Sequence, residues 1–209
     1  MTLSRSGELR VGTSMDRERE LAIVGRLRSG DPEAFDEVHD AFNARLFNFL
    51  FRLSNRREVA EDLLEETWLR LVTHAQRLQD DTSLGAWLFT VARRLHVGYC
   101  RSRLLEESHA ADLIGLWPGG SRRPSQYEVM EAGEAQRRLA TALASLPPAY
   151  REALLLVVVE GLKPSEAAAI CGVTGEAMRQ RLSRARARLA QRLAGTDGPG
   201  LTSLDEVTT

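Results

Sequence analysis

The sequence predicts an all-α protein with two small helical domains joined by a flexible linker, the second of which contains a helix-turn-helix. Apolar residues recur every three or four positions along most of the chain, whereas alternating β-branched runs and Asn-Gly hairpin signals are nearly absent. A length of 209 residues, 43% of them hydrophobic and 27% charged, suffices for one or two modest cores. Changes in periodicity divide the chain into an arm (1–17), a first domain (18–104), a linker (105–127), a second domain (128–194) and a tail (195–209).

The composition excludes several classes of protein. No segment approaches the ~20 apolar residues that span a bilayer, and the first ten residues lack the apolar core of a secretory signal, so we expect a cytoplasmic protein without membrane insertion. Cys100 and Cys171 form no C-x-x-C pattern, and both are expected to be buried. His96 lies four residues before Cys100, but no third ligand is near, so neither a metal nor a cofactor is predicted. The sequence offers no nucleophile and base pair or phosphate-binding glycine loop, which argues against an enzyme.

The first domain begins with two helices separated by a short turn. Leu21, Val24 and Leu27 lie at helical spacing, and this helix is expected to stop at Gly30. Asp31 can cap the next helix, with Pro32 in its first turn, where a missing N–H costs nothing. A wide apolar stripe predicts that this second helix is buried on one side; it comprises Phe35, Val38, Phe42, Leu46, Phe49 and Leu53.

Segment 55–78 repeats the apolar pattern, with Val59, Leu63, Leu71, Ala75 and Leu78 predicted inside, and adds a cluster of acids to its first turns. The cluster comprises Glu58, Glu61, Asp62, Glu65 and Glu66. Each carboxylate near a helix N-terminus gains ~0.3–1 kcal/mol from the helix dipole, so a purely structural role is one explanation. Because five neighbouring carboxylates also repel one another, a docking surface for a basic partner is favoured.

Segment 78–104 contains a polar loop followed by a helix with a basic side. Its predicted core side carries Leu84, Trp87, Leu88, Val91 and Leu95. The opposite side carries Arg93, Arg94, Arg101 and Arg103, together with Phe89 and Tyr99. Arginines that follow phosphates and rings on which bases stack suit single-stranded nucleic acid. A solvated helix with ordinary core aromatics is the alternative.

The linker at 105–127 is rich in Pro, Gly and Ser, and its Trp117 is either a partner contact or an apolar anchor on its own chain. Helical order resumes near Tyr127 and breaks at Pro147 and Pro148.

The second domain then has the helix ends, turn and cap residue that are typical of a helix-turn-helix. Gly161 closes one helix, and a short helix with three adjacent alanines follows over 165–171. Gly172 and Val173 form the predicted turn, after which Thr174 caps the last helix.

The last helix gathers arginines on its outer side, although the chain as a whole has a formal charge of only -1. Met178, Leu182, Ala185 and Leu189 form its predicted buried stripe. Glu176, Arg179, Gln180, Ser183 and Arg184 must then point outward, where arginine can read guanine and glutamine can read adenine in a major groove. Arg181, Arg186 and Arg188 are better placed for phosphates. A solvated cationic helix is the alternative.

Three segments in order resemble bacterial RNA polymerase sigma factors of the extracytoplasmic-function type. "AEDLLEETWLRL" looks like the segment with which that family grips the clamp helices of the polymerase β′ subunit, and "LGAWLFTVARRL" resembles the element that recognises and opens the minus-ten promoter region. "LPPAYREALLLVVVEGLKPSEAAAICGVTGEAMRQRLSRARARL" is similar to the domain that reads the minus-thirty-five element. The resemblance implies core RNA polymerase (β′ clamp helices and β flap), promoter DNA and an anti-sigma factor as partners, and it leaves catalysis to the core enzyme.

The resemblance also assigns roles to individual residues. Core polymerase binding falls to Glu61, Asp62, Glu65 and Glu66. Minus-ten contacts fall to Gln79, Asp80, Asp81, Thr82, Ser83, Trp87, Arg93, Arg94, Gly98, Tyr99 and Arg101. Minus-thirty-five contacts fall to Thr174, Glu176, Arg179, Gln180, Arg181, Ser183, Arg184, Arg186 and Arg188.

This sequence departs from the family pattern at three of those positions. Relatives commonly have glutamine where Glu65 stands, asparagine where Arg94 stands, and an acidic or amide residue where Gly98 stands. Two other functions remain open from sequence alone. A stand-alone helix-turn-helix regulator would share the second domain but would leave the acidic and basic helices of the first domain unexplained. A purely helical interaction protein would share the apolar stripes but not the arginine face after the turn.

Overall fold

The structure is a computed structural model that describes residues 17–110 and 133–194. In the first range, α1 (Arg17–Arg28), α2 (Pro32–Ser54), α3 (Arg57–His74), the 3-10 turn η1 (Ala75–Arg77) and α4 (Leu84–Ala110) follow one another. In the second lie α5 (Glu134–Ala144), α6 (Pro148–Leu154), the π-helical turn η2 (Leu155–Val159), α7 (Pro164–Cys171) and α8 (Gly175–Ala194). No strand occurs within these ranges, which confirms the all-α prediction. We refer to α1–α4 as the first unit and to α5–α8 as the second unit.

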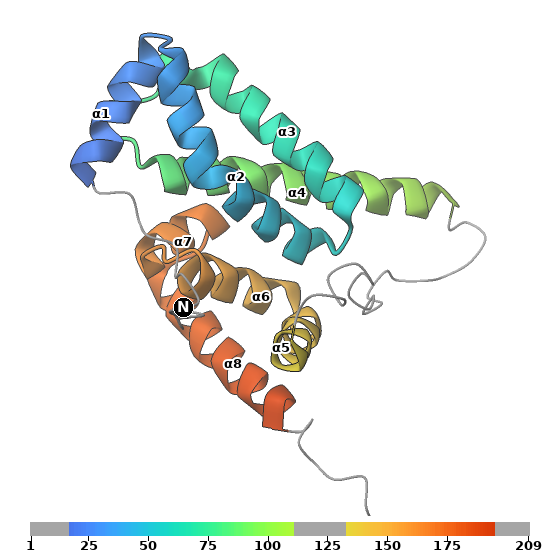
Figure 1. The fold of residues 1–209 in the computed structure, drawn as a ribbon. Helices are drawn as coiled ribbons and strands as arrows, with labels where there is room; N and C mark the ends of the chain where they lie inside the picture. Colours follow the sequence, from blue (N-terminus) through green and yellow to red (C-terminus); the bar gives the residue numbers. More distant parts are fainter. Residues whose placement is uncertain (1–16, 111–132, 195–209) are drawn as a thin grey trace, which may run out of the picture.

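In the first unit, α2, α3 and α4 pack on one another, and α1 lies against α2 and η1 (Figure 1). The predicted apolar stripe of α2 faces this packing, because Val38, Phe42, Leu46 and Phe49 are all buried. Phe49 meets Phe89 of α4 edge to face, with ring centroids 5.2 Å apart. Such aromatic pairs add to the free energy of burial beyond their area alone, so this contact helps fix α4 against α2.

Hydrogen bonds between residues close in sequence define the two ends of α2. The Asp31 side chain accepts a hydrogen bond from the Glu33 N–H (3.0 Å) and so caps α2, with Pro32 at its first position. Gly30 just before it has φ +78°, a left-handed conformation that other residues adopt at a cost. α2 ends at Asn55, which is also left-handed, and its N–H donates to the Phe51 carbonyl at 2.8 Å.

In the second unit, α6 and α7 pack against α8, and α5 also contacts α8 (Figure 1). α6 begins at Pro148, where the sequence predicts a break. It continues into η2, where the Glu160 N–H donates to the Leu155 carbonyl five residues earlier (2.9 Å). Gly161 then turns the chain with φ +71° toward α7.

The two units are packed against each other rather than held apart. α4 contacts α7, α2 contacts α6, and the buried side chains of both units form one continuous hydrophobic cluster. Figure 1 shows α4 lying along the top of the second unit, with its C-terminal end projecting beyond it. Promoter-facing surfaces predicted on α4 therefore lie close to the second unit.

Two expectations differ from the structure. α4 continues to Ala110, six residues into the segment expected to be linker, and the rest of that segment, including Trp117, lies outside the described residues, as do 1–16 and 195–209. Cys171 is buried, but the expectation that Cys100 is buried too was wrong, because Cys100 lies on an exposed side of α4. Cys100 Sγ lies 3.7 Å from His96 Nε2.

Among the residues that the structure describes, no group of three or more His, Cys, Asp or Glu side chains could hold a metal ion. None of the helices in these ranges combines the length and the apolar character needed to cross a bilayer.

We expect Arg26 to govern the acid stability of the first unit. Its guanidinium donates to Asp31 (2.7 Å) and Glu37 (2.5 Å), and these hydrogen bonds hold the pKa of both carboxyls below their ordinary values. An unfolded chain takes up these protons at higher pH than the folded one, so this stabilisation is present above about pH 4.5 and is lost as the pH falls through the folded pKa values. Arg26→Ala should therefore flatten the decline of Tm below about pH 4.5. Thermal unfolding from pH 3 to 7 checks this, with Arg186→Ala on α8 as the control; equal slopes in both variants would contradict it.

Candidate nucleic-acid and partner interfaces

The turn before α8 has the geometry that a helix-turn-helix requires. Gly172 is left-handed, with φ +66°, and its N–H donates to the Ala169 carbonyl (3.2 Å). Thr174 then caps α8, because its hydroxyl accepts from the Ala177 N–H at 3.1 Å. These contacts fix the direction in which α8 leaves the turn, which confirms the predicted helix-turn-helix.

α8 separates into a buried side and an exposed side. Met178, Leu182 and Ala185 are buried, and Leu189 packs against the same cluster, as predicted. The predicted contact residues lie opposite: Arg181 is half-buried, whereas exposed positions are held by Thr174, Glu176, Arg179, Gln180, Ser183, Arg184, Arg186 and Arg188. The sequence therefore placed these side chains on the accessible side of the helix.

Three of the exposed side chains form a cluster near the start of α8. Glu176 accepts from the Arg179 guanidinium (2.6 Å) and from the Gln180 amide (3.2 Å). The hydrogen bond from Arg179 is the main reason why the pKa of Glu176 is lowered. The donors of Arg179 and Gln180 are thus oriented by a neighbouring carboxylate before any ligand binds.

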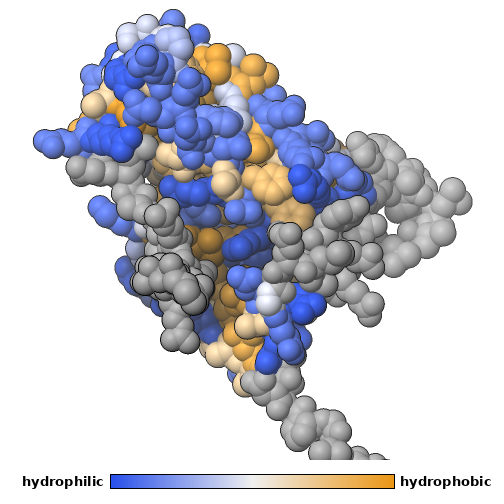
Figure 2. Space-filling model, viewed as in Figure 1, coloured by the Kyte–Doolittle hydropathy of each residue, from blue (hydrophilic) through white to orange (hydrophobic). Residues whose placement is uncertain are grey.

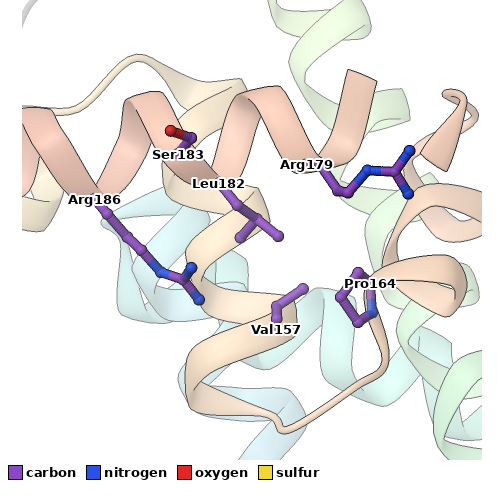
Figure 3. A pocket seen from close by; sticks show the side chains of 6 residues that line it. All are labelled: Val157, Pro164, Arg179, Leu182, Ser183 and Arg186. Carbon is purple, nitrogen blue, oxygen red and sulfur yellow. The ribbon is translucent and has the colours of Figure 1, made fainter. Parts of the chain in front are cut away.

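Arginines also lie along the two flanks of α8. Arg179 and Arg186 flank a hollow of about 400 Å³ between α8, η2 and the start of α7, whose floor includes Val157, Pro164 and Leu182 (Figure 3). On the other flank, the Arg188 guanidinium lies 5.1 Å from the ring centroid of Tyr150 in α6. The contact with Tyr150 therefore restricts the Arg188 side chain, which helical spacing alone does not predict.

The predicted minus-ten loop, Gln79–Ser83, joins η1 to α4 and is tied to α1. The Ser83 hydroxyl and the Gly85 N–H both donate to the Glu20 carboxylate, at 3.5 and 3.3 Å. Arg17 donates to the Asp81 carbonyl (2.5 Å), and Arg28 forms an ion pair with Asp80. Glu20 is buried, and sequence reasoning missed it because nothing marks an acid on α1 as a contact of a loop some sixty residues later.

α4 presents part of the predicted basic surface. Arg94, Gly98 and Arg101 are exposed, whereas Trp87 is half-buried. Tyr99 is half-buried, and its hydroxyl lies 3.1 Å from an Arg56 donor nitrogen. Phe89, counted on the exposed side from the sequence, is instead fully buried in contact with Phe49. Phe89 therefore cannot stack on a base, because it belongs to the core.

Arg93 of α4 makes a contact that the sequence did not indicate. Its Nε donates to Oε1 of Glu152 in α6 at 2.6 Å, and both side chains are largely buried between the units. His96, one turn later, is buried enough for its pKa to be lowered to about 4, so it is neutral at physiological pH. The other Glu152 oxygen accepts from the Cys171 thiol (3.4 Å), whose pKa burial and Glu152 raise to about 12.

α3 carries the predicted acidic surface and extends it with apolar residues. Glu61 pairs with Arg57 (2.8 Å) and Glu66 with Arg70 (2.7 Å), while the described residues show no ion pair for the exposed Asp62 and Glu65. Further along the helix, Leu69 and Val72 are 56% and 59% exposed. Figure 2 shows hydrophobic surface over this C-terminal part of α3. Helical spacing places these apolar side chains beside the acids, which makes a surface that suits a protein partner better than solvent.

Comparison with known proteins accounts for both units. Residues 24–113 match the family described as Sigma-70 region 2, and residues 136–189 match the family described as Sigma-70, region 4. The chain is 33% identical over 156 residues to the ECF RNA polymerase sigma factor SigM of Bacillus subtilis, covering 74% of this chain and 91% of SigM. It is 35% identical over 143 residues to the sigma factor EcfG of Rhodopseudomonas palustris, covering 68% of this chain and 75% of EcfG.

Solved structures agree with these matches. The sigma factor RpoE of Bartonella quintana, in complex with the anti-sigma factor NepR, is similar with a TM-score of 0.57 and 27% identity, over 87% of this chain and 97% of RpoE. CnrH, in complex with the cytosolic domain of CnrY, shares the fold with a TM-score of 0.63 at 21% identity, over 86% of this chain and 99% of CnrH. The chain therefore belongs to the extracytoplasmic-function family of RNA polymerase sigma factors, proteins that direct core polymerase to promoters.

Proposed function

We propose that the two units divide promoter recognition between them. The first domain, 18–104, binds core polymerase and contacts and opens the minus-ten element, and the second, 128–194, reads the minus-thirty-five element. The observation that carries this proposal is α8, which leaves the left-handed turn at Gly172 with a buried stripe on one side and arginine and glutamine donors on the other. This arrangement suits a major groove, in which a helix reads base edges.

Core polymerase binding falls to the acidic surface of α3, comprising Glu61, Asp62, Glu65 and Glu66, which would meet the β′ clamp helices. Leu69 and Val72 extend that surface with apolar area. Burying this area would contribute to the affinity for core polymerase, whereas the charges would orient the two proteins. The second unit would meet the β flap. Catalysis then belongs to the core enzyme, and the chain acts in the cytoplasm, where polymerase and chromosome lie.

Minus-ten recognition falls to the Gln79–Ser83 loop and to the exposed residues of α4. The contacts of the Ser83 hydroxyl with Glu20 and of the Asp81 carbonyl with Arg17 hold the loop in place and leave the Gln79 side chain exposed. A base removed from its stack costs a few kcal/mol, which a preformed loop can offset better than a mobile one. We therefore infer that α1 positions the loop that captures a flipped base.

An anti-sigma factor is a further proposed partner of this chain. Its support is that the similar RpoE of Bartonella quintana was solved in complex with the anti-sigma factor NepR. The RpoE structure is 27% identical over most of both chains, so this chain is expected to be held by an inhibitor of the same kind.

Binding to core polymerase followed by run-off transcription tests the proposed function. A sigma factor should be retained by core polymerase and should start transcripts at defined promoters only with core present. A stand-alone helix-turn-helix regulator would instead bind its operator tightly by itself and would neither join core polymerase nor support transcription. That result would overturn the proposal.

We expect Arg94→Asn to weaken the salt dependence of promoter opening. Arg94 is exposed on α4 and adds a positive charge where relatives commonly have asparagine. Loss of one phosphate contact should reduce the slope of log affinity against log salt by about 1 and should change the minus-ten sequences selected from a randomised library. Arg137→Asn is the charge-matched control, because Arg137 is exposed on α5 and carries no assigned DNA contact. Equal slopes and equal selections for Arg94→Asn and the parent would contradict the assignment.

A further inference from the structure

The main chain of the loop between η1 and α4 is already hydrogen-bonded within the molecule. The Thr82 N–H donates to the Gln79 carbonyl (3.0 Å), and Arg17 donates to the Asp81 carbonyl (2.5 Å). The loop carbonyls that accept such hydrogen bonds are those of Gln79, Asp81, Thr82 and Ser83. Because these acceptors are in use, a base that enters the loop is selected by side chains.

The side chains of the loop are not equally available to a base. Asp80 forms an ion pair with an arginine of α1, and the Ser83 hydroxyl donates to Glu20 at 3.5 Å. By contrast, the described residues offer no hydrogen bond or ion pair to the Asp81 carboxylate or to the Thr82 hydroxyl. Asp81 is exposed and Thr82 is half-buried, so a ligand can reach both groups.

An unpaired carboxylate opposes binding to the DNA backbone, because the phosphates carry the same sign of charge. Asp81 therefore lowers the affinity for DNA unless it also makes a favourable contact with a base. An ionised carboxylate only accepts hydrogen bonds, and the donors that DNA bases offer are amine and ring N–H groups. These properties match Asp81 to a donor on a base.

The bases differ in the donors that they offer on the edge used for pairing, which is the edge that a protein reads in a flipped base. Cytosine, adenine and guanine each carry an exocyclic amine next to a ring nitrogen. Thymine carries one N–H between two carbonyls, and both carbonyls repel a carboxylate. The Thr82 hydroxyl can donate or accept, so it fits the ring nitrogen of each of the three amino bases. The Gln79 amide can also do both, and it therefore selects no base by itself.

We propose that Asp81 is a specificity-determining residue of the minus-ten site and accepts a hydrogen bond from the exocyclic amine of the captured base, while Thr82 bonds to the adjacent ring nitrogen. This inference rests on the proposed function, since it names the class of base that the loop selects. Arg28 neutralises Asp80, and Arg17 adds positive charge beside the Asp81 main chain. Of the two carboxylates of the loop, Asp81 is thus the one left for the base.

The first experiment finds the promoter position that Asp81 selects. Transcription by the holoenzyme from a library randomised over the minus-ten element is compared for the parent, Asp81→Ala and the control Glu18→Ala. Glu18 is an exposed acid of α1 with no assigned DNA contact, so its loss matches the change in charge. Circular dichroism checks that each variant is folded.

We expect the parent to disfavour thymine about tenfold at one position, which corresponds to the loss of one good base contact. Asp81→Ala should lose this preference at that position and keep the others, whereas Glu18→Ala should select the same promoters as the parent. The proposal would be overturned if Asp81→Ala changed no position, or if the parent preferred thymine at the position that changed.

The second experiment removes the amine from the DNA while the carboxylate stays. Holoenzyme binding is measured with a single-stranded minus-ten oligonucleotide that carries the selected base or its analogue without the amine. The analogues are pyrimidin-2-one for cytosine, purine for adenine and hypoxanthine for guanine. The selected base itself identifies which of the three amino bases the loop captures.

The parent should bind the analogue about tenfold more weakly than the natural base, and Asp81→Ala should bind both equally, because the contact is already lost. Equal losses in the parent and in Asp81→Ala would mean that another group contacts the amine, and the proposal would be wrong.

Asp81→Asn is a second variant, which keeps the size of the side chain and adds an N–H donor. Its amide can donate to a thymine carbonyl, so the penalty against thymine should shrink; an unchanged penalty contradicts the proposal. Run-off transcription separates this inference from the proposed function. A parent that is inactive with core polymerase contradicts the proposed function, whereas an active parent whose selection does not depend on Asp81 contradicts only the assignment of Asp81.

Discussion

Replacing Asp62 and Glu66 by alanine is expected to weaken the binding of core polymerase by about tenfold or more while the chain remains folded. A hydrogen bond to a charged group contributes roughly 1.5–3 kcal/mol when its partner is lost, and tenfold in affinity corresponds to about 1.4 kcal/mol. The acids lie on the same face of α3 as the exposed Leu69 and Val72. The apolar part of the surface should therefore retain some binding in the variant.

Folding should hardly change in this variant, for reasons visible in α3. Asp62 is exposed, and the Glu66–Arg70 pair is a surface pair four residues apart, which is worth about 0.3–0.5 kcal/mol. Circular dichroism and thermal unfolding should thus match those of the parent. Competition with the parent protein for a limiting amount of core polymerase measures the affinity. Glu18→Ala/Glu134→Ala, which removes two exposed acids from α1 and α5, serves as the charge-matched control; if it competes no better than the α3 variant, the surface has been placed wrongly.

Helical periodicity was enough to predict most of this fold. The caps at Asp31 and Thr174 and the turn at Gly172 depend on contacts within three or four residues, so their chemistry is readable from a short segment. Periodicity also predicted correctly which side of α8 is buried and which is exposed. It failed at Phe89, because α4 is covered on more than one side by α2 and α7, and a single apolar stripe cannot describe such a helix.

The contacts that the sequence could not supply join residues far apart in the chain. Arg93 meets Glu152 fifty-nine positions later, and Glu20 meets Gly85 sixty-five positions later. From sequence alone, an arginine or glutamate on a helix is predicted to be solvent-exposed, because charged side chains are rarely buried unless they are paired. The prediction changes only when the distant partner is known. Leu69 and Val72 lie outside the apolar stripe predicted for α3, and the structure exposes both.

Arg184→Ala and Arg188→Ala are expected to affect the second unit in different ways. Arg184 is exposed on the outer side of α8, and the described residues show no hydrogen bond or ion pair for it. Its loss should remove ~1–3 kcal/mol of discrimination at one or two base pairs of the minus-thirty-five element. Arg188 lies on the flank, with its guanidinium over Tyr150, and should act on the DNA backbone.

The difference between the two arginines follows from how freely each guanidinium can approach DNA. Arg188, held over Tyr150, can offer its outer N–H groups to a phosphate but cannot turn into the groove without leaving the ring, so Arg188→Ala should weaken binding to every promoter about equally and lower the salt slope by about 1. Holoenzyme binding to promoters that carry each substitution in the minus-thirty-five element, measured at several salt concentrations, separates the two patterns. Tyr150→Leu is the matched control: it removes the ring without removing the charge of Arg188, so it should keep the salt slope of the parent. If Arg184→Ala and Arg188→Ala gave the same profile across promoters, the division of α8 into a base-reading side and a phosphate-contacting flank would be wrong.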